Sequence, residues 1–136
     1  MIVDTSALVA IAKGEDGDHR LLRAIYGEAG LLPAPALVEF TRVVSGARIS
    51  DSDAAHAMLA DVLSGPLALF AFSAEHARIA ADANARYGTG NGHGGTLNML
   101  DLMIYACAQA SGRPILCTGR DFAATDAEIH PASRAD

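Results

Sequence analysis

Short apolar runs alternate along the chain with longer stretches whose apolar residues recur at helical spacing. The short runs predict strands at 2–4, 31–32, 67–72 and 114–117, with a fifth at 128–130. The longer stretches predict helices over 6–13, 18–29, 35–44, 50–63, 73–86 and 97–110, several opened by Ser, Asp or Pro and followed by Gly. Such alternation predicts an α/β fold, with a parallel sheet covered by helices on both faces.

Acidic side chains follow two of the predicted strands. Asp4 closes the first strand, and Asp121 follows the fourth by a few residues. In open parallel sheets, sites form beyond the carboxyl ends of the strands where the strand order reverses. Glu39 lies on the helix after the second strand, and Asp101 lies near the start of the helix before the fourth. If the first and fourth strands are neighbours, all four carboxylates reach one crevice.

Asp101 is the carboxylate that local structure explains least well. It stands between Leu100 and Leu102 in the apolar run LNMLDLMIYACA, residues 97–108. No cation lies three or four positions away on the helix, and the interaction with the helix N-terminus is worth less than about 1 kcal/mol at exposed sites. An unpaired buried carboxylate costs much more than that. Its position therefore indicates a compensating group elsewhere in the fold.

The other carboxylates also have ordinary interpretations. Asp4 suits a helix cap, and Glu39 suits a surface ion pair with Arg42. Asp121 and Asp126 suit turn or cap positions, and either is a candidate for a fourth acidic residue of a site. Carboxylates that converge raise one another's pKa values, and hard divalent cations with oxygen ligands relieve that conflict. The set therefore predicts a Mg²⁺ or Mn²⁺ site, where two ions serve in-line phosphoryl chemistry.

Composition bounds the domain count and the compartment. The 136 residues suit one domain, expected over 1–130 with a frayed tail over 131–136. A net charge of −6 argues by itself against nucleic-acid binding, but two bound divalent cations would reduce it to −2. No stretch has the layout of a signal peptide or a membrane span. Cys107 and Cys117 lack CxxC spacing, so we expect buried free thiols in a cytoplasmic protein.

Competing motifs fit the sequence poorly. The five histidines form no HxxxH or HExxH pair, which disfavours zinc. A haloacid-dehalogenase-type phosphatase needs Asp-x-Asp after the first strand, where Ser6 holds the second position. A receiver domain needs a lysine after a late strand, whereas Lys13 is the only lysine. The run GNGHGG at 90–95 matches GxGxxG in form alone, because it follows a predicted helix instead of a first strand.

Four stretches, in this order, resemble a PIN domain, specifically a VapC-type toxin ribonuclease. They are MIVDTSALVAI, PALVEF, YGTGNGHGGTLNMLDLMIYACA and ILCTGRDFAATDAEI, and together they extend over nearly the whole chain. The resemblance implies a three-layer α/β/α sandwich around a parallel five-stranded sheet and Mg²⁺- or Mn²⁺-dependent cleavage of RNA. It also implies a homodimer and a cognate VapB-type antitoxin whose C-terminal segment blocks the active site.

By position, Asp4, Glu39 and Asp101 match the three principal acidic ligands of that family, and Asp121 matches the more variable fourth. Two hydroxyl positions of the family, which orient ligands or water, are matched by Thr5 and Thr118. The family often has a basic residue in the segment that matches 87–90, which is neutral here, and many members have Cys where this chain has Leu102. The nearest cations for gripping RNA are Arg86, Arg113 and Arg120.

Two other functions remain open on the sequence alone. A non-catalytic PIN-like module would bind RNA or a protein without cutting it, although such a module gains nothing from clustered carboxylates. A structure-specific DNA nuclease would use similar chemistry, but the chain shows no added DNA-binding element.

Overall fold

The computed structural model describes residues 1–47 and 49–133 and contains a parallel sheet of four strands in the order β3-β2-β1-β4. The strands are β1 (Ile2–Val3), β2 (Gly30–Pro33), β3 (Leu67–Phe70) and β4 (Ile115–Leu116). The helices are α1 (Thr5–Lys13), α2 (Asp18–Glu28), α3 (Ala34–Val44), α4 (Ser52–Leu63), α5 (Ala74–Tyr87) and α6 (Met99–Ser111). The predicted α/β architecture is thus confirmed, and each predicted helix is present.

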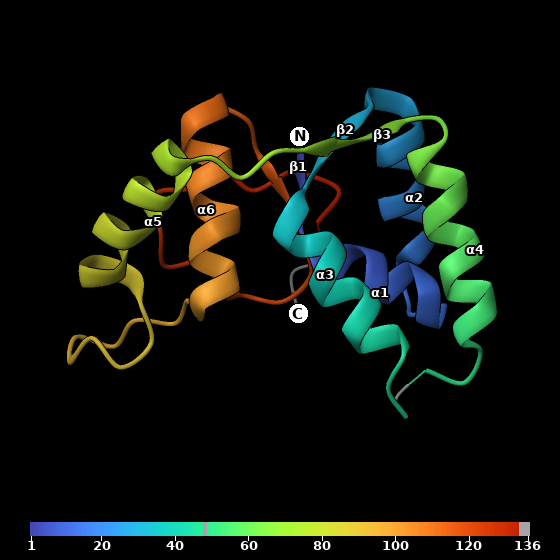
Figure 1. Ribbon diagram of the computed structural model, residues 1–136, viewed down its shortest axis with the longest axis horizontal. Coiled ribbons are helices and arrows are strands. Elements are labelled where there is room, and N and C mark those ends of the chain that lie inside the picture. Colours follow the sequence, from blue (N-terminus) through green and yellow to red (C-terminus); the bar gives the residue numbers. More distant parts are fainter. Residues whose placement is uncertain (48, 134–136) are drawn as a thin grey trace.

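The helices form two layers with the strands between them. Figure 1 shows α5 and α6 packed together on one side of the strands and α1 to α4 gathered on the other. The first three strands follow one another across the sheet, and the chain then crosses through α5 and α6 to place β4 on the other side of β1. The strand order therefore reverses at β1, which is where a site is expected in a sheet of this kind.

The sheet has four strands where five were expected. Residues 128–130 contribute a single parallel bridge, between Ile115 and Ile129. In this bridge the Ile115 amide donates a hydrogen bond to the Glu128 carbonyl, and the His130 amide donates one to the Ile115 carbonyl. The pairing stops there because the next amide of this register, that of Cys117, donates instead to the Ser133 hydroxyl at 3.1 Å. The Ser133 side chain thus takes the place of the next backbone acceptor, and among the described residues no fifth strand forms beyond the single bridge.

Part of the tail that was expected to fray is held against this bridge. Ser133 Oγ also donates to the Ile115 carbonyl at 3.3 Å, and the backbone N–H of Ala132 donates to His130 Nδ1 at 3.0 Å. The opposite ring atom, His130 Nε2, lies 2.9 Å from Glu28 Oε2 on α2. The segment 131–133 is therefore hydrogen-bonded to the fold, while residues 134–136 lie outside the described part of the chain.

Capping residues set the ends of the two helices that carry the site. The side chain of Asp4 caps α1 by accepting the amide of Ser6, and Gly14 ends this helix with a φ of 63°, a conformation that glycine adopts without strain. α6 opens with a capping box between Asn98 and Asp101. Within the described ranges, no helix is long and apolar enough to span a bilayer.

Candidate active site

The crevice of the candidate site lies beyond the carboxyl ends of β1 and β4. The two strands pair in register through Ile2 with Ile115 and Val3 with Leu116. The amide of Asp4 continues this pairing by donating to the Leu116 carbonyl at 2.9 Å. The first residue after β1 is thereby fixed beside the segment that follows β4, which meets the condition on which the convergence of the carboxylates depended.

Asp4 is buried and strongly hydrogen-bonded. Its Oδ2 accepts a hydrogen bond from the backbone N–H of Ser6 at 3.0 Å and another from the Ser6 hydroxyl. Burial raises the pKa of Asp4 above its ordinary value, the hydrogen bonds from Ser6 and the Thr5 backbone oppose that rise, and the charge of Asp121 adds to it. Asp4 therefore caps a helix and belongs to the acidic cluster at the same time.

Asp101 is half-buried at the first turn of α6. Its Oδ2 accepts the backbone N–H of Asn98 at 2.9 Å, and its own amide donates to Asn98 Oδ1 at 2.9 Å. Burial raises the pKa of Asp101 to about 7, the Asn98 hydrogen bond opposes the rise, and the charges of Asp4, Asp121 and Glu39 add to it. The hydrogen bond from the Asn98 N–H therefore offsets only part of the cost of burying the Asp101 charge. The surroundings still disfavour the charged form.

Glu39 and Asp121 complete the acidic cluster from α3 and from the turn after β4. Burial raises the pKa of Glu39, the charge of Asp4 adds to the rise, and Arg42 opposes it. Asp121 is exposed, and Gly119 helps to place it because a φ of 80° turns the chain directly after Thr118. The glycine-rich loop holds this turn from the other side, since Thr96 Oγ1 donates to the Asp121 carbonyl at 2.7 Å.

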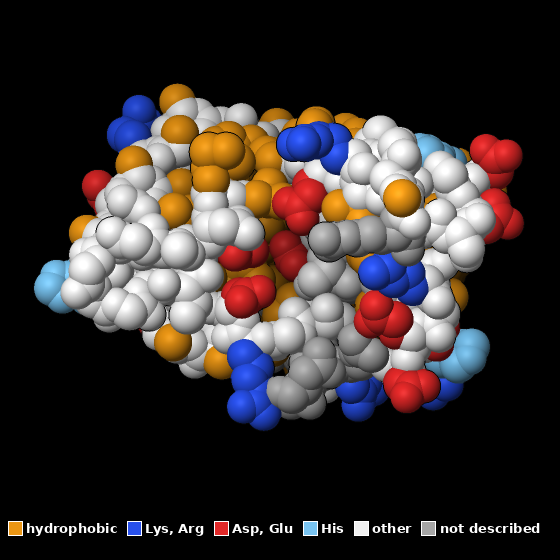
Figure 2. All heavy atoms as spheres, turned by 90° about the horizontal axis from the view of Figure 1, so that it is seen from below, with side chains coloured by type: hydrophobic (Ala, Val, Ile, Leu, Met, Phe, Trp, Pro, Cys, Tyr) orange, Lys and Arg blue, Asp and Glu red, His pale blue; other side chains and the backbone are white. Residues whose placement is uncertain are grey.

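The four carboxylates lie within range of one another's charge on one face of the molecule. Figure 2 shows acidic side chains around a hollow at the centre of this face. In the described part of the chain, no group of three or more His, Cys, Asp or Glu side chains is arranged to hold a metal ion.

The donor chemistry of this cluster fits a hard divalent cation. Its donors are carboxylate oxygens, the ligands that Mg²⁺ and Mn²⁺ prefer. The neighbouring thiol of Cys117 is a poor ligand, because burial and the charges of Asp4, Asp121 and Asp101 raise its pKa to about 12. Cys107 and Cys117 are both buried and unpaired, as expected from their spacing. A soft metal such as zinc is therefore not favoured here.

Hydroxyl groups reach the cluster from a different residue than expected. The Thr5 hydroxyl donates to the Ala36 carbonyl on α3 at 3.3 Å, so it ties α1 to α3. Thr118 contributes its backbone N–H, which donates to Ser6 Oγ at 3.0 Å. Ser6, which the sequence suggested only as part of a capping run, is the residue whose hydroxyl contacts Asp4.

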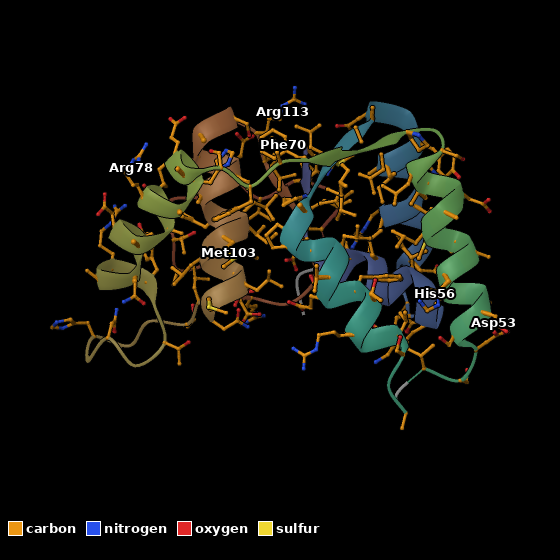
Figure 3. The ribbon with its side chains drawn as sticks, viewed as in Figure 1. Asp53, His56, Phe70, Arg78, Met103 and Arg113 are labelled. Atoms are coloured by element: carbon orange, nitrogen blue, oxygen red, sulfur yellow. The ribbon has the colours of Figure 1, made fainter. Side chains whose placement is uncertain are left out.

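Of the three arginines considered for RNA, one lies at the opposite end of the sheet and one contacts tyrosine side chains. Arg113 lies just before β4, at the end of the sheet where β1 begins, and Figure 3 shows it at that far end of the molecule. Arg86 lies over the Tyr87 ring, with its guanidinium carbon 4.9 Å from the centroid, and donates to the Tyr105 hydroxyl at 3.4 Å. Arg120 alone is both exposed and adjacent in sequence to a residue of the acidic cluster.

A groove between α3 and α6 adjoins the acidic cluster. It has a volume of about 940 Å³, and its lining includes Glu39 and Asn98 together with mainly apolar side chains. Val38 and Met99 line it while 61% and 74% exposed, which is high for large apolar residues. Met103, labelled on α6 in Figure 3, and Arg42 on α3 also line the groove. A sizeable apolar surface thus lies directly beside the carboxylates.

Known proteins are similar to this chain in sequence and in fold. The PIN domain family matches residues 1–128. Ribonuclease VapC42 of Mycobacterium tuberculosis is 40% identical over 134 residues, which cover 97% of this chain and 98% of that protein.

Solved structures with this fold include the VapC20 toxin of M. tuberculosis, described as cleaving the sarcin-ricin loop. It superimposes with a TM-score of 0.72 at 20% identity, covering 96% of this chain and 98% of that one. A toxin–antitoxin complex from Klebsiella pneumoniae contains a chain with a TM-score of 0.65 at 18% identity, covering 98% and 95%. The likeness to these structures shows the fold, and the family match and the sequence identity show the descent. The chain therefore belongs to the PIN-domain family, as a member of its VapC group of ribonucleases.

Proposed function

We propose that this protein is an Mg²⁺- or Mn²⁺-dependent endoribonuclease that acts in the cytoplasm as the toxin of a toxin–antitoxin pair. The observation that carries the proposal is the environment of Asp101. Its pKa rises to about 7 because of burial and three nearby carboxylates drawn from distant parts of the chain. Perturbed carboxylates that share one cleft are typical of functional sites.

The side chains of the cluster divide their roles by position. Asp4 at the carboxyl end of β1 and Asp101 at the start of α6 would be ligands of a divalent ion. Glu39 on α3 would be a third ligand. Asp121, exposed at the mouth, would complete the ligand set, and Arg120 beside it offers a guanidinium to a backbone phosphate. Divalent ions held by these carboxylates would supply the positive charge for in-line attack of water on the phosphate and for departure of the 3′ oxygen. The products would be a 5′-phosphate and a 3′-hydroxyl.

A cleavage assay with end-labelled RNA tests this function. The protein should cut RNA in Mg²⁺ or Mn²⁺, fail to cut in EDTA, and leave ends that polynucleotide ligation and phosphatase treatment identify as 5′-phosphate and 3′-hydroxyl. Asp101→Asn should abolish cleavage, whereas the matched change Asp82→Asn on the exposed surface of α5 should not. A cyclic-phosphate product, or full activity of the Asp101 variant, would contradict the mechanism. Folded protein that shows neither cleavage nor stabilisation by Mg²⁺ would favour a non-catalytic binding module.

The antitoxin part of the proposal rests on the kind of protein that shares this fold. One solved relative is a toxin–antitoxin complex, and an acidic crevice is a surface that a basic side chain of an inhibitory segment can enter. The test is to look for a small reading frame beside the gene and to co-express its product with this protein. The two chains should co-purify, and RNA cleavage should be suppressed in the complex.

The same proposal includes a homodimer formed through the groove between α3 and α6. Large exposed apolar side chains such as Val38 and Met99, facing one groove, are typical of an interaction site. The groove also carries one arginine, Arg42, and one glutamate, Glu39. Apolar surface with charges of both signs suits a two-fold interface, in which each copy presents the same patch to the other.

A further inference from the structure

The hydroxyl of Ser6 bridges the ends of the two strands that form the crevice. Ser6 is the second residue of α1, yet its Oγ accepts the backbone N–H of Thr118 from a position 112 residues later, at 3.0 Å. The same hydroxyl donates a hydrogen bond to Asp4 Oδ2. One small side chain therefore joins the segment after β4 to the carboxylate after β1.

The direction of both hydrogen bonds follows from their chemistry. The amide of Thr118 can only donate, so it uses a lone pair of the Ser6 oxygen and leaves the hydroxyl proton free. An ionised carboxylate can only accept, so that proton is directed to Asp4 Oδ2. The Thr118 amide therefore donates to the Ser6 hydroxyl, and the Ser6 hydroxyl donates to the Asp4 carboxylate. In this series each donor has a single acceptor.

Ser6 also directs a second donor at the same carboxylate oxygen. Its backbone N–H donates to Asp4 Oδ2 at 3.0 Å, so Oδ2 receives two hydrogen bonds from one residue. The Thr5 backbone is a further hydrogen-bond donor to this carboxylate. Together these donors hold the Asp4 side chain in one orientation beside the segment after β4.

We propose that Ser6 is the positioning residue of the carboxylate site, which joins Asp4 to the segment after β4 and holds its carboxylate in the orientation that binds a divalent cation. The inference rests on the proposed metal-dependent function and deepens it. A capping role alone does not account for the geometry, because the Asp4 side chain already caps α1 through the backbone N–H of Ser6, and any residue except proline supplies that N–H. The hydroxyl adds the link to Thr118, which no cap requires.

The variants Ser6→Ala and Ser6→Thr separate this role from simple packing. Alanine removes the hydroxyl but suits a helix, so the fold is kept, and threonine restores the hydroxyl. Ser64→Ala is the matched control, because the Ser64 hydroxyl contacts only the Asp61 carbonyl at the end of α4, away from the crevice. Mn²⁺ binding to each purified full-length protein is measured by titration calorimetry and by the EPR signal of free Mn²⁺.

Ser6→Ala should weaken Mn²⁺ binding about 10-fold, the lower end of the effect seen when a group that orients a metal ligand is removed. Ser6→Thr should recover most of the affinity, and Ser64→Ala should match the wild type. The Thr118 amide resonance should shift in the alanine variant and not in the threonine variant. Unchanged Mn²⁺ affinity in Ser6→Ala overturns the inference while leaving the proposed nuclease intact. Wild-type protein that neither binds Mn²⁺ nor cuts RNA overturns both.

Discussion

The hydroxyl of Tyr105 donates a hydrogen bond of 2.6 Å to Oδ1 of Asp126, which joins the middle of α6 to the segment that follows β4. Arg86 approaches the same carboxylate, with its Nη1 4.0 Å from Asp126 Oδ2. The Tyr105 hydrogen bond is the main reason that the pKa of Asp126 lies below its ordinary value. Asp126 is thus engaged with α5 and α6, whereas the charge of Asp121 acts on Asp4 and Asp101.

Replacing Tyr105 with phenylalanine should destabilise the fold without affecting the site. The change leaves Asp126 with one donor fewer, and because Asp126 is 57% exposed and water can replace that donor, we expect a loss of about 1 kcal/mol in the free energy of unfolding. Urea denaturation measures the loss. Tyr26→Phe is the control, because Tyr26 is 56% exposed on α2. Equal stability of the two variants, or loss of Mn²⁺ binding in Tyr105→Phe, would contradict the anchoring role.

Asp101→Asn should make the metal-free protein more stable at pH 8. The amide removes a charge that burial and three carboxylates disfavour, and its oxygen can still accept the Asn98 N–H. Solvent screens this half-buried site, so we expect a gain of about 1 kcal/mol in EDTA. Asp82→Asn should leave the unfolding midpoint unchanged. A less stable Asp101 variant would mean that the carboxylate is compensated inside the protein.

The stability of the metal-free protein should fall as the pH rises from about 4 to about 7. The pKa of Asp101 is raised from 3.8 to about 7 in the folded state, so in this range the folded chain binds more protons than the unfolded one. Asp4 and Glu39 have pKa values raised in the same direction and add to the slope. Melting temperatures in EDTA measure the effect, which should be smaller in Asp101→Asn. A wild-type slope equal to that of the variant would assign the titration to other groups.

Polar substitutions in the groove should dissociate the expected homodimer. Val38→Gln with Met99→Gln removes apolar surface that is already exposed in the single chain, so the protomer should stay folded. Light scattering after gel filtration should give the mass of two chains for the wild type and of one chain for the variant. Tyr26→Gln, an equally exposed site on α2, should remain dimeric. If all three proteins have the same mass, the groove is not the interface.

The sequence predicted the helices and the convergence of carboxylates because both follow from local patterns and strand connectivity. The apolar spacing and caps located α1 to α6 closely, and the rule for strand ends brought Asp4 and Asp121 to one side of the sheet. The sequence predicted that a group elsewhere in the fold offsets the buried charge of Asp101, but it did not predict the hydrogen bond from Asn98. An acid three residues after an Asn cap is the signature of a capping box, and that signal was present in the order Asn98 to Asp101.

Side-chain direction was beyond reach of the sequence. Thr5 and Ser6 are adjacent hydroxyl residues, and which of them faces the crevice depends on the rotation of α1 against α3, where Ala36 accepts the Thr5 hydroxyl. Arg113 precedes β4, so its place at the far end of the sheet could be read from strand polarity once β4 is assigned. The expected fifth strand is reduced to a single bridge because the Cys117 amide donates to the Ser133 hydroxyl. The spacing of apolar residues cannot predict such a hydrogen bond.

The sheet order has a consequence for when the crevice can exist at all. Its walls come from Asp4, near the amino terminus, and from Asp121, and the amide of Thr118 must reach Ser6 to join them. A growing chain that has delivered only β1, β2 and β3 has no partner for the free edge of β1. The nascent chain therefore has no crevice until β4 has left the ribosome and paired with β1. A chain cut anywhere between α1 and β4 and separated into its two fragments loses the crevice completely.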